Sequence, residues 1–243
     1  MNDLDLAKHI AQGAGKILLD LRATGLFEGK ALGKAGDRVA NAFIMSALRE
    51  HRPDDGILSE EEQDNEARLG RQRVWIIDPL DGTREYGEGR ADWAVHVALA
   101  IDGQPVIGAV ALPGVGQVML SQPQPLPPIA SKLRLLVSRT RPAREALIVA
   151  ERLGAELVPM GSAGAKAMAV LRGEADIYLH TGGQYEWDNC APAAVAMAAG
   201  LHASRVDGSD LVYNNKTPYL PDVLICQKHL APQVLAALYE SVA

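Results

Sequence analysis

The sequence predicts an α+β fold made of two subdomains, and three observations support this prediction. Apolar and polar residues alternate from Trp93 onward, which is typical of an antiparallel sheet. Strand-like and helix-like segments alternate after residue 131, which favours parallel or mixed strand pairing. The proline-rich stretch QPQPLPP, residues 122–128, separates the two patterns and can continue neither a helix nor a central strand. We therefore expect subdomains over residues 1–121 and 131–243.

Two amphipathic helices are predicted at the start of the chain. Apolar residues recur at helical spacing from Leu4 to Leu21, and Asn2 or Asp3 is a candidate N-cap. A second helix is predicted to begin near Gly36–Asp37. Its apolar face would consist of Val39, Phe43, Ile44, Ala47 and Leu48. The turn-forming run PDDG, residues 53–56, ends this helix, and a short strand at Ile57–Leu58 follows.

An antiparallel meander follows these helices. Val74–Ile77 is predicted as a strand, and the Asp102–Gly103 pair indicates a hairpin turn between two later strands. The chain then returns over 106–112 and again over 117–120. One face of the strand before the hairpin carries Trp93, Val95, Val97, Leu99 and Ile101. His96 points to the other face, and we expect it to be packed in the sheet rather than to act as a ligand.

The second half alternates strands with helices. Strands are predicted over 133–137, 157–160 and 176–179. Helices are predicted over 142–153, 165–172 and 192–199, and from Pro232 to the C-terminus. Glycines follow three of these helices, at Gly154, Gly173 and Gly200, where a positive φ commonly ends a helix. The Asp207–Gly208 pair predicts a further hairpin.

Composition argues against several classes of protein. The chain of 243 residues has a formal net charge of -6 and no long basic run, so we expect no nucleic-acid partner. No run approaches the roughly 18 apolar residues of a membrane span. The N-terminus is acidic and amphipathic, unlike a signal peptide. Cys190 and Cys226 lie in no CxxC or Cys/His cluster. These features predict a cytoplasmic protein. Because the net charge is negative, an anionic ligand would need local positive charge or bound cations.

The stretch WIIDPLDGT, residues 75–83, carries the clearest chemical signal. Asp78 and Asp81 end an apolar strand, and Pro79 fixes the bend between them. Two ionised carboxylates about 4 Å apart repel by about 4 kcal/mol at an effective dielectric constant near 20, so a cation between them would stabilise the pair. Oxygen ligands without His or Cys favour Mg²⁺ over zinc. Gly82 then lets the backbone approach a phosphate. The alternative is a plain turn, because these residues are all turn formers.

Acidic residues also follow or precede two other predicted elements. Glu60 comes after a short strand, and Asp188 comes before a helix. Taken singly, Glu60 is explained by a solvated acidic loop, and Asp188 by an N-cap. Together with Asp78 and Asp81, they predict one shared metal site beside a phosphate, which is the arrangement that hydrolyses phosphate esters.

The motifs IIDPLDGT and WDNCAP together resemble the inositol monophosphatase superfamily of Mg²⁺-dependent phosphatases. The resemblance covers essentially the whole chain, because further segments occur in the order found in that family. These segments are LSEE (58–61), the meander, GSAGAKAMAV (161–170) and EWDNCAP (186–192). It implies a layered α/β/α/β/α sandwich of the inositol monophosphatase and fructose bisphosphatase type. It also implies a homodimer, since family members are often dimers.

The resemblance further implies a set of metal ligands and catalytic groups. Two Mg²⁺ ions would share the ligands Glu60, Asp78, the Leu80 carbonyl, Asp81 and Asp188. Asp37 would help to hold a third, weaker ion, although Gly36 stands where the family usually has threonine or alanine. Glu60 and Thr83 would position and deprotonate a water molecule, with Asp81 beside them. The N–H groups of Gly82 and Thr83 would grip the phosphate.

The residues after the DGT motif favour one branch of the superfamily. Arg84-Glu85-Tyr86 resembles the bisphosphate nucleotidases of the CysQ type, whereas inositol phosphatases usually have Asn-Phe in this region. Ser162, Lys166 and the N-terminus of their helix would bind a second phosphate. Arg84 and Asp188 would also face the substrate. The alternative for Lys166 is a solvated helix lysine.

The resemblance therefore implies hydrolysis of the 3′-phosphate of adenosine 3′,5′-bisphosphate (PAP) to AMP and phosphate. Two alternatives stay within the superfamily, namely an inositol monophosphatase and a broad-specificity sugar phosphatase. A third alternative is a binding protein that keeps the metal ligands without turnover. Tyr185 and Tyr86 are candidates to stack on adenine, with ordinary packing as the alternative explanation for both.

Overall fold

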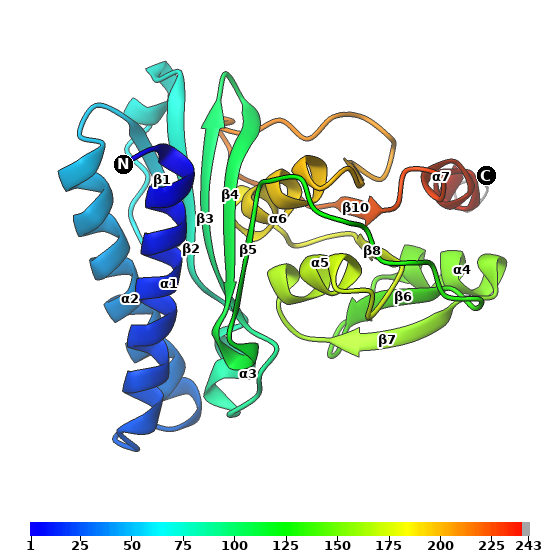
Figure 1. Ribbon diagram of the computed structural model, residues 1–243, viewed down its shortest axis with the longest axis horizontal. Coiled ribbons are helices and arrows are strands. Elements are labelled where there is room, and N and C mark those ends of the chain that lie inside the picture. Colours follow the sequence, from blue (N-terminus) through cyan, green and yellow to red (C-terminus); the bar gives the residue numbers. More distant parts are fainter. Residues whose placement is uncertain (240–243) are drawn as a thin grey trace.

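The computed structural model describes residues 1–239 and consists of five layers, as Figure 1 shows. The helices α1 (Asp3–Ala23) and α2 (Gly29–His51) cover one face of a five-stranded sheet. The helices α5 (Ala163–Leu171) and α6 (Glu186–Ala198) lie between this sheet and a second one. A third pair of helices covers the outer face of the second sheet. The expected layered α/β/α/β/α sandwich is confirmed.

The first sheet contains the predicted meander. In spatial order its strands are β1 (Gly56–Ser59), β2 (Arg73–Asp81), β3 (Ala94–Ile101), β4 (Gln104–Leu112) and β5 (Gln117–Leu120). β1 pairs in parallel with β2, and the later neighbours are antiparallel. Asp102 and Gly103 have φ values of 50° and 77°. These are the two positive values that a type I′ hairpin turn requires, so the turn prediction is confirmed.

Both faces of β2 are buried, which explains its nearly continuous apolar sequence. Trp75 and Ile77 pack with α1 and α2 in one core cluster, whereas Val74 and Ile76 pack with α5 and α6 in another. The alternation along β2 thus sends successive side chains into different layers. The polar end of the same strand carries Asp78 and Asp81, and α3 (Thr83–Gly87) follows it directly.

The second sheet is mixed. Its order is β7 (Glu156–Met160), β6 (Arg134–Ser138), β8 (Ile177–His180), β10 (Val223–Cys226) and β9 (His202–Ser204). β6 runs parallel to β7 and β8, and β10 is antiparallel to β8 and β9. The outer helices are α4 (Arg144–Leu153) and α7 (Ala231–Tyr239). The end of the last predicted helix, residues 240–243, lies outside the described residues.

The hairpin predicted around Asp207–Gly208 is wrong. A turn does form there, since the Gly208 N–H donates to the Arg205 carbonyl at 3.0 Å. However, β9 before this turn pairs with β10, which begins only at Val223. The long-range partner on β10 therefore replaces the local one that the turn residues indicated.

Helix α2 begins seven residues before the predicted start. Glycine weakens a helix locally, but the glycines in this part of α2 are needed because neighbouring segments pack closely against them. A Cβ at Gly33 would lie 2.5 Å from Thr83 Cγ2, and one at Gly36 would lie 2.9 Å from Leu18 Cδ2. The first of these contacts lets α2 pass close to the turn that follows β2. Val39, which was expected on the buried face, is 42% exposed.

The start of α6 lies six residues before the predicted one, so Pro192 sits inside the helix. Asp188 is consequently the third residue of α6 rather than a residue that precedes the helix. Its Oδ2 accepts a hydrogen bond from the Tyr185 N–H at 2.7 Å, which secures the first turn. The predicted cap of α1 is confirmed at Asn2, whose Oδ1 accepts from the Asp5 N–H at 2.8 Å.

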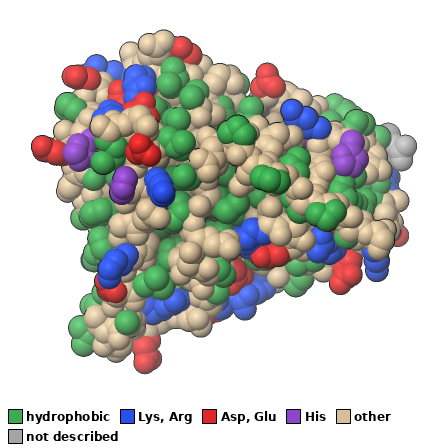
Figure 2. Space-filling view, viewed as in Figure 1, with side chains coloured by type: hydrophobic (Ala, Val, Ile, Leu, Met, Phe, Trp, Pro, Cys, Tyr) green, Lys and Arg blue, Asp and Glu red, His purple; other side chains and the backbone are tan. Residues whose placement is uncertain are grey.

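The segment between the two sheets, residues 122–133, forms no helix or strand. The proposed division into two subdomains at this segment stays a prediction. Within residues 1–239, no helix combines the length and apolar character required to cross a membrane. Acidic and basic side chains are interspersed over the face shown in Figure 2.

Candidate active site

Three predicted metal ligands come together where β2 meets α6. Asp78, Asp81 and Asp188 each offer one carboxylate oxygen, and these atoms all lie within 4.8 Å of one another. Asp78 is 2% exposed and Asp81 is 7% exposed, so two of the three carboxylates are buried. Buried acidic groups this close require protonation or a counter-ion.

The bend at the end of β2 creates this cluster. The register with β3 shifts between Asp78 and Asp81, so both side chains leave the regular pleat. Asp78 Oδ1 accepts from the Leu80 N–H at 3.0 Å, and Thr83 Oγ1 donates to the Leu80 carbonyl at 3.1 Å. Gly82 has a φ of 87°, and a Cβ there would lie 3.1 Å from Ser162 Cβ. A side chain at this position would therefore be strained and crowded.

Glu60 and Asp37 complete the acidic group from two other elements. Ser59 is paired with Ile77 in the parallel β1–β2 ladder, so the next residues along the two strands, Glu60 and Asp78, are neighbours. Asp37, on α2, is 8% exposed, and its Oδ1 has no hydrogen-bond partner among the described residues. An unpaired buried carboxylate oxygen that faces other acids is well placed to meet a cation.

Most of these carboxyl groups bind protons unusually tightly. Burial raises the pKa of Asp37 to about 7, with a further contribution from Glu61. Partial burial, followed by the charge of Asp37, raises the pKa of Glu60 to about 7. Burial and the nearby Asp81 raise the pKa of Asp188 to about 7. Burial and the neighbouring acids, Glu60 first, also raise the pKa of Asp78 well above its ordinary value. The group therefore carries electrostatic strain that divalent cations would relieve.

Asp81 behaves differently because His96 and the start of α5 hold it as an anion. Its Oδ2 accepts from Ser162 Oγ at 2.5 Å and from the Gly164 N–H at 2.6 Å, and its Oδ1 accepts from the Ala163 N–H at 3.1 Å. Burial acts to raise the pKa of Asp81, but its contact with His96 and these hydrogen bonds lower it to about 2. Asp81 thus stays ionised while its neighbours bind protons.

His96 is a partner of Asp81 that sequence reasoning missed. The residue is fully buried, as expected for a packed histidine of the sheet, and its Nε2 lies 3.2 Å from Asp81 Oδ2. Its Nδ1 lies 2.9 Å from the Trp187 carbonyl. Burial favours the neutral ring, but the Asp81 carboxylate outweighs this effect and raises the pKa of His96. Strand register could have indicated this contact, because His96 on β3 pairs with Asp78 on β2, near Asp81.

A polar cavity of about 280 Å³ adjoins the acidic cluster. Five of the six predicted substrate residues line it, namely Gly82, Thr83, Arg84, Ser162 and Lys166. The sixth, Asp188, does not line this cavity and lies instead in the acidic cluster. The Lys166 side chain is 5% exposed, and its Nζ donates to the Gly161 and Ser162 carbonyls at 3.1 Å and 2.6 Å. Burial lowers the pKa of Lys166 despite the opposing charge of Asp81. The alternative of a solvated helix lysine is therefore wrong.

Sequence reasoning also missed the loop after β6 as part of this cavity. Ser138, Thr140 and Arg141 line it, and the Arg141 side chain makes no ion pair or hydrogen bond within the part of the chain that the structure describes. The adjacent Arg139 is instead paired with Glu85 at 2.9 Å. The place of this loop in the sheet could have indicated its role, because the loop follows β6, and ligands commonly bind beyond the carboxyl ends of parallel strands such as β6 and β7.

The two tyrosines suggested for adenine stacking have different positions. Tyr86 is fully buried, and its hydroxyl donates to the Leu18 carbonyl at 2.7 Å, so it cannot stack on a ligand. Tyr185 is 40% exposed and lies three residues before Asp188. Its ring stacks on Trp187 with a centroid distance of 4.8 Å and an interplanar angle of 4°. Of the two candidates, only Tyr185 keeps a ring face near solvent.

A layered α/β/α/β/α fold that brings several acids to one strand end, beside a polar cavity, defines a metal-dependent enzyme site for an anionic substrate. The chain belongs to the inositol monophosphatase family, whose model matches residues 4–243. That family is metal-dependent, and the Asp78, Asp81 and Asp188 cluster can hold a metal ion.

Named relatives lie in the nucleotidase branch of the family. The chain is 47% identical over 256 residues to a 3′-phosphoadenosine 5′-phosphate phosphatase of Mycobacterium leprae, covering 99% of this chain and 94% of the relative. It is 50% identical over 243 residues to the phosphatase of the same name in Mycobacterium bovis, covering 94% and 90%. The 3′(2′),5′-bisphosphate nucleotidase CysQ of Escherichia coli is 31% identical over 76% of this chain and 81% of its own length.

Solved structures support the fold assignment. CysQ from Bacteroides thetaiotaomicron matches with a TM-score of 0.81 at 24% identity, over 93% of this chain and 97% of that structure. Inositol monophosphatase II from Staphylococcus aureus matches with a TM-score of 0.83 at 20% identity, over 98% and 93%. At these identities the likeness establishes the architecture of the chain and nothing about its substrate.

Proposed function

We propose that this chain is a Mg²⁺-dependent phosphatase that removes the 3′-phosphate from adenosine 3′,5′-bisphosphate, yielding AMP and phosphate. The observation that carries the proposal is the convergence of Asp78, Asp81 and Asp188 beside a cavity lined by Lys166 and Arg141. The names of the relatives at 47% and 50% identity support the same substrate. An inositol monophosphatase is less favoured, because the relatives at these identities are named as phosphatases of the nucleotide.

The donor set fits Mg²⁺. Every proposed ligand is an oxygen atom, and hard cations such as Mg²⁺ prefer carboxylate and carbonyl oxygens. Glu60, Asp78 and the Leu80 carbonyl would hold one ion, and Asp78 would share a second with Asp81 and Asp188. Asp37 would contribute to a third, weaker site through its unpaired Oδ1. When bound, Mg²⁺ lowers the pKa of water and neutralises charge on the reacting phosphate.

The remaining steps are assigned to side chains of this protein. Thr83 connects the Leu80 carbonyl with Asp37, since it donates to the first and contacts the second. With Glu60, it would orient the attacking water, and the Glu60 carboxylate would accept the proton of that water as the general base. Gly82 and Thr83 line the cavity and would present backbone N–H groups to the phosphate. His96 and the start of α5 fix Asp81 in its ionised, metal-binding form.

The second phosphate of the substrate would lie deeper in the cavity. Lys166 and Arg141 supply positive charge there, and Arg84 lines the same cavity. Ser162 would act mainly by positioning, because its hydroxyl already donates to Asp81 and accepts from the Ala165 N–H at 2.9 Å. A substrate with one phosphate leaves these cations unpaired, which is the physical basis for preferring a bisphosphate. A homodimer and a cytoplasmic location remain predictions from the sequence.

The test is a direct comparison of substrates. Phosphate release is measured with Mg²⁺ from adenosine 3′,5′-bisphosphate and from inositol 1-phosphate, at matched concentrations. We expect a clear preference for the nucleotide and no activity in the presence of a chelator. A preference for the inositol ester contradicts the proposed substrate, and absence of turnover on both favours a binding protein that has kept the acidic cluster.

A further inference from the structure

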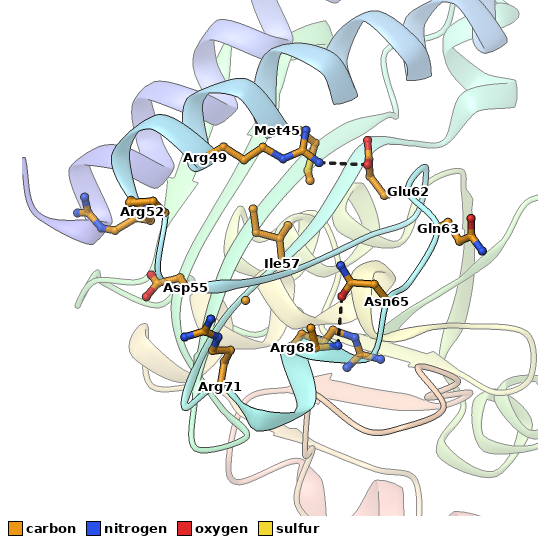
Figure 3. Close-up of a pocket in the computed structure, with 13 residues that line it drawn as sticks. Met45, Arg49, Arg52, Asp55, Ile57, Glu62, Gln63, Asn65, Arg68 and Arg71 are labelled. Atoms are coloured by element: carbon orange, nitrogen blue, oxygen red, sulfur yellow. Dashed lines mark hydrogen bonds and ion pairs between the residues drawn. The ribbon is translucent and has the colours of Figure 1, made fainter.

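A separate cavity of about 380 Å³ lies at the C-terminal end of α2, and none of the proposed active-site residues lines it. Figure 3 shows Arg49 and Glu62 joined along one side, with Arg71 and Arg68 on the opposite side and Ile57 between them. The volume falls in the range of about 300–1,000 Å³ that is typical of small-ligand sites. Nothing in the proposed reaction uses this cavity.

Positive charge is in excess along the walls of the cavity. The arginines that line it are Arg49, Arg52, Arg68 and Arg71. The two acids that line it already have hydrogen-bond partners, and Glu62 also pairs with Arg49. Asp55 accepts from Arg73 at 2.9 Å and from Trp75 Nε1 at 2.8 Å. Glu62 accepts from Asn41 at 2.8 Å. Arg52 and Arg68 are paired with Asp3 and Asp64, which do not line the cavity. The positive charge that still faces the space therefore belongs to Arg71 and, beside Glu62, to Arg49.

Two of these arginines remain available to a ligand. Arg71 forms no ion pair and no side-chain hydrogen bond with any residue in the range 1–239. Arg49 has a single charged contact, to Glu62 Oε2 at 3.3 Å, and its side chain is 62% exposed. By contrast, Arg68 is held by Asp64 and Asn214 at 2.7 Å each, and serves to fix the wall. Arg49 and Arg71 thus present guanidinium groups from different segments of the chain.

The rest of the lining is suited to a compact organic body. Met45, Pro53 and Ile57 supply an apolar part, while Gln63 and Asn65 add neutral polar groups. Two guanidinium groups on separate walls match an oxyanion with two negative charges, since each can bind it through paired N–H donors. A phosphate group meets this requirement, either free or as the ester of a small molecule.

We propose that this cavity is a second anion site, which binds a phosphate dianion between Arg49 and Arg71. The site is independent of the metal cluster, because none of its lining residues belongs to that cluster. The proposal does not rest on the proposed function, and the two are tested by different readouts.

The test maps binding by position on the Mg²⁺-loaded full chain. Inorganic phosphate is titrated while the backbone amide NMR signals of Asn65 and Arg71 are followed separately from those of Gly82 and Gly161. We expect saturable shifts at Asn65 and Arg71 with their own Kd. Shifts confined to the active-site amides overturn the proposal, whatever their size.

Variants provide the second part of the test. Arg71→Gln breaks no ion pair of the described chain, so it should fold normally. Combined with Arg49→Gln, it should weaken the Kd reported by the cavity amides about tenfold, as loss of charge-assisted hydrogen bonds does. Lys228→Gln removes one exposed positive charge elsewhere and should leave this Kd unchanged. An unchanged Kd in the double variant, or the same loss in Lys228→Gln, overturns the proposal.

A second probe identifies the source of the anion. Ribose 5-phosphate is titrated in the same way as inorganic phosphate. Equal affinities for the two probes mean that the site recognises only the phosphate group. Tighter binding of ribose 5-phosphate means that the apolar part of the cavity also contributes. Both results support the anion site, whereas the absence of shifts at Asn65 and Arg71 with either probe rejects it.

Discussion

Removal of divalent cations should make the stability of this protein fall as the pH rises. Burial raises the pKa of Asp37 to about 7 in the folded chain, against an ordinary value of 3.8. A carboxyl group with a raised folded pKa has no effect below about pH 4, where it is protonated in both states. Above that pH the unfolded state ionises first, so the folded state loses relative stability until the pH passes about 7.

The size of this effect follows from the Asp37 shift. Between pH 5 and the folded pKa of about 7 lie about two pH units, and one unit corresponds to about 1.4 kcal/mol. Asp37 alone should therefore lower the free energy of unfolding by roughly 3 kcal/mol between pH 5 and pH 8. For a chain of this length, that corresponds to a fall in Tm of about 6 °C. Glu60 and Asp188, also raised to about 7, act in the same direction.

Thermal unfolding at pH 5 and pH 8, with a chelator and with saturating Mg²⁺, measures this effect. Mg²⁺ should raise the Tm more at pH 8, because protons compete with the ion for the same carboxylates at pH 5. Asp37→Asn should flatten the pH dependence of the metal-free protein, and Asp54→Asn in an exposed turn should not. If Asp37→Asn leaves that dependence unchanged, the acidic group is not strained, and the electrostatic argument for a cation site fails.

Three further outcomes are expected. Asp81→Asn should abolish nearly all phosphatase activity, as measured by initial rates. It should also cost about 1–3 kcal/mol of stability, measured by the Tm, because the amide cannot accept all of the carboxylate's hydrogen bonds. Gly164→Ala would place a Cβ 2.0 Å from His96 Nε2, so it should destabilise the fold by about 1–3 kcal/mol in denaturant unfolding. Gly70→Ala, with open space around it, should be tolerated. Arg141→Gln should raise KM for the bisphosphate about tenfold and leave KM for a substrate with a single phosphate nearly unchanged. Equal effects on the two substrates contradict a role for Arg141 at the second phosphate.

Local patterns predicted the first sheet well. Alternation placed Trp93 and its partners on one face, and the Asp102–Gly103 turn formed as expected, because both features depend on neighbouring residues. The helix starts were harder. Gly33 and Gly36 weaken a helix in isolation, yet α2 contains both because Thr83 and Leu18 pack directly against them. A contact between distant segments therefore decided what local propensity could not.

The acidic side of the candidate site was also predictable, whereas its basic side was only partly so. Asp78 and Asp81 belong to one short motif, so their proximity follows from the chain itself. Arg141 reaches the cavity only because the loop after β6 folds against the turn after β2, on a different sheet. His96 reaches Asp81 through strand register. Neither position carries a recognisable local pattern, so only the tertiary structure reveals it.

Asp81 connects the two sheets through chemistry as well as through packing. It lies at the end of β2 in the first sheet, and its carboxylate accepts three hydrogen bonds from the start of α5, which packs between the sheets. The anion thus satisfies N–H groups that a helix start leaves unpaired. The same charge contributes to the cluster with Asp78 and Asp188. Because these hydrogen bonds require the two halves of the chain to be packed together, the complete acidic cluster can form only when the middle layer is in place. Folding and assembly of the proposed metal site should therefore occur as a single event.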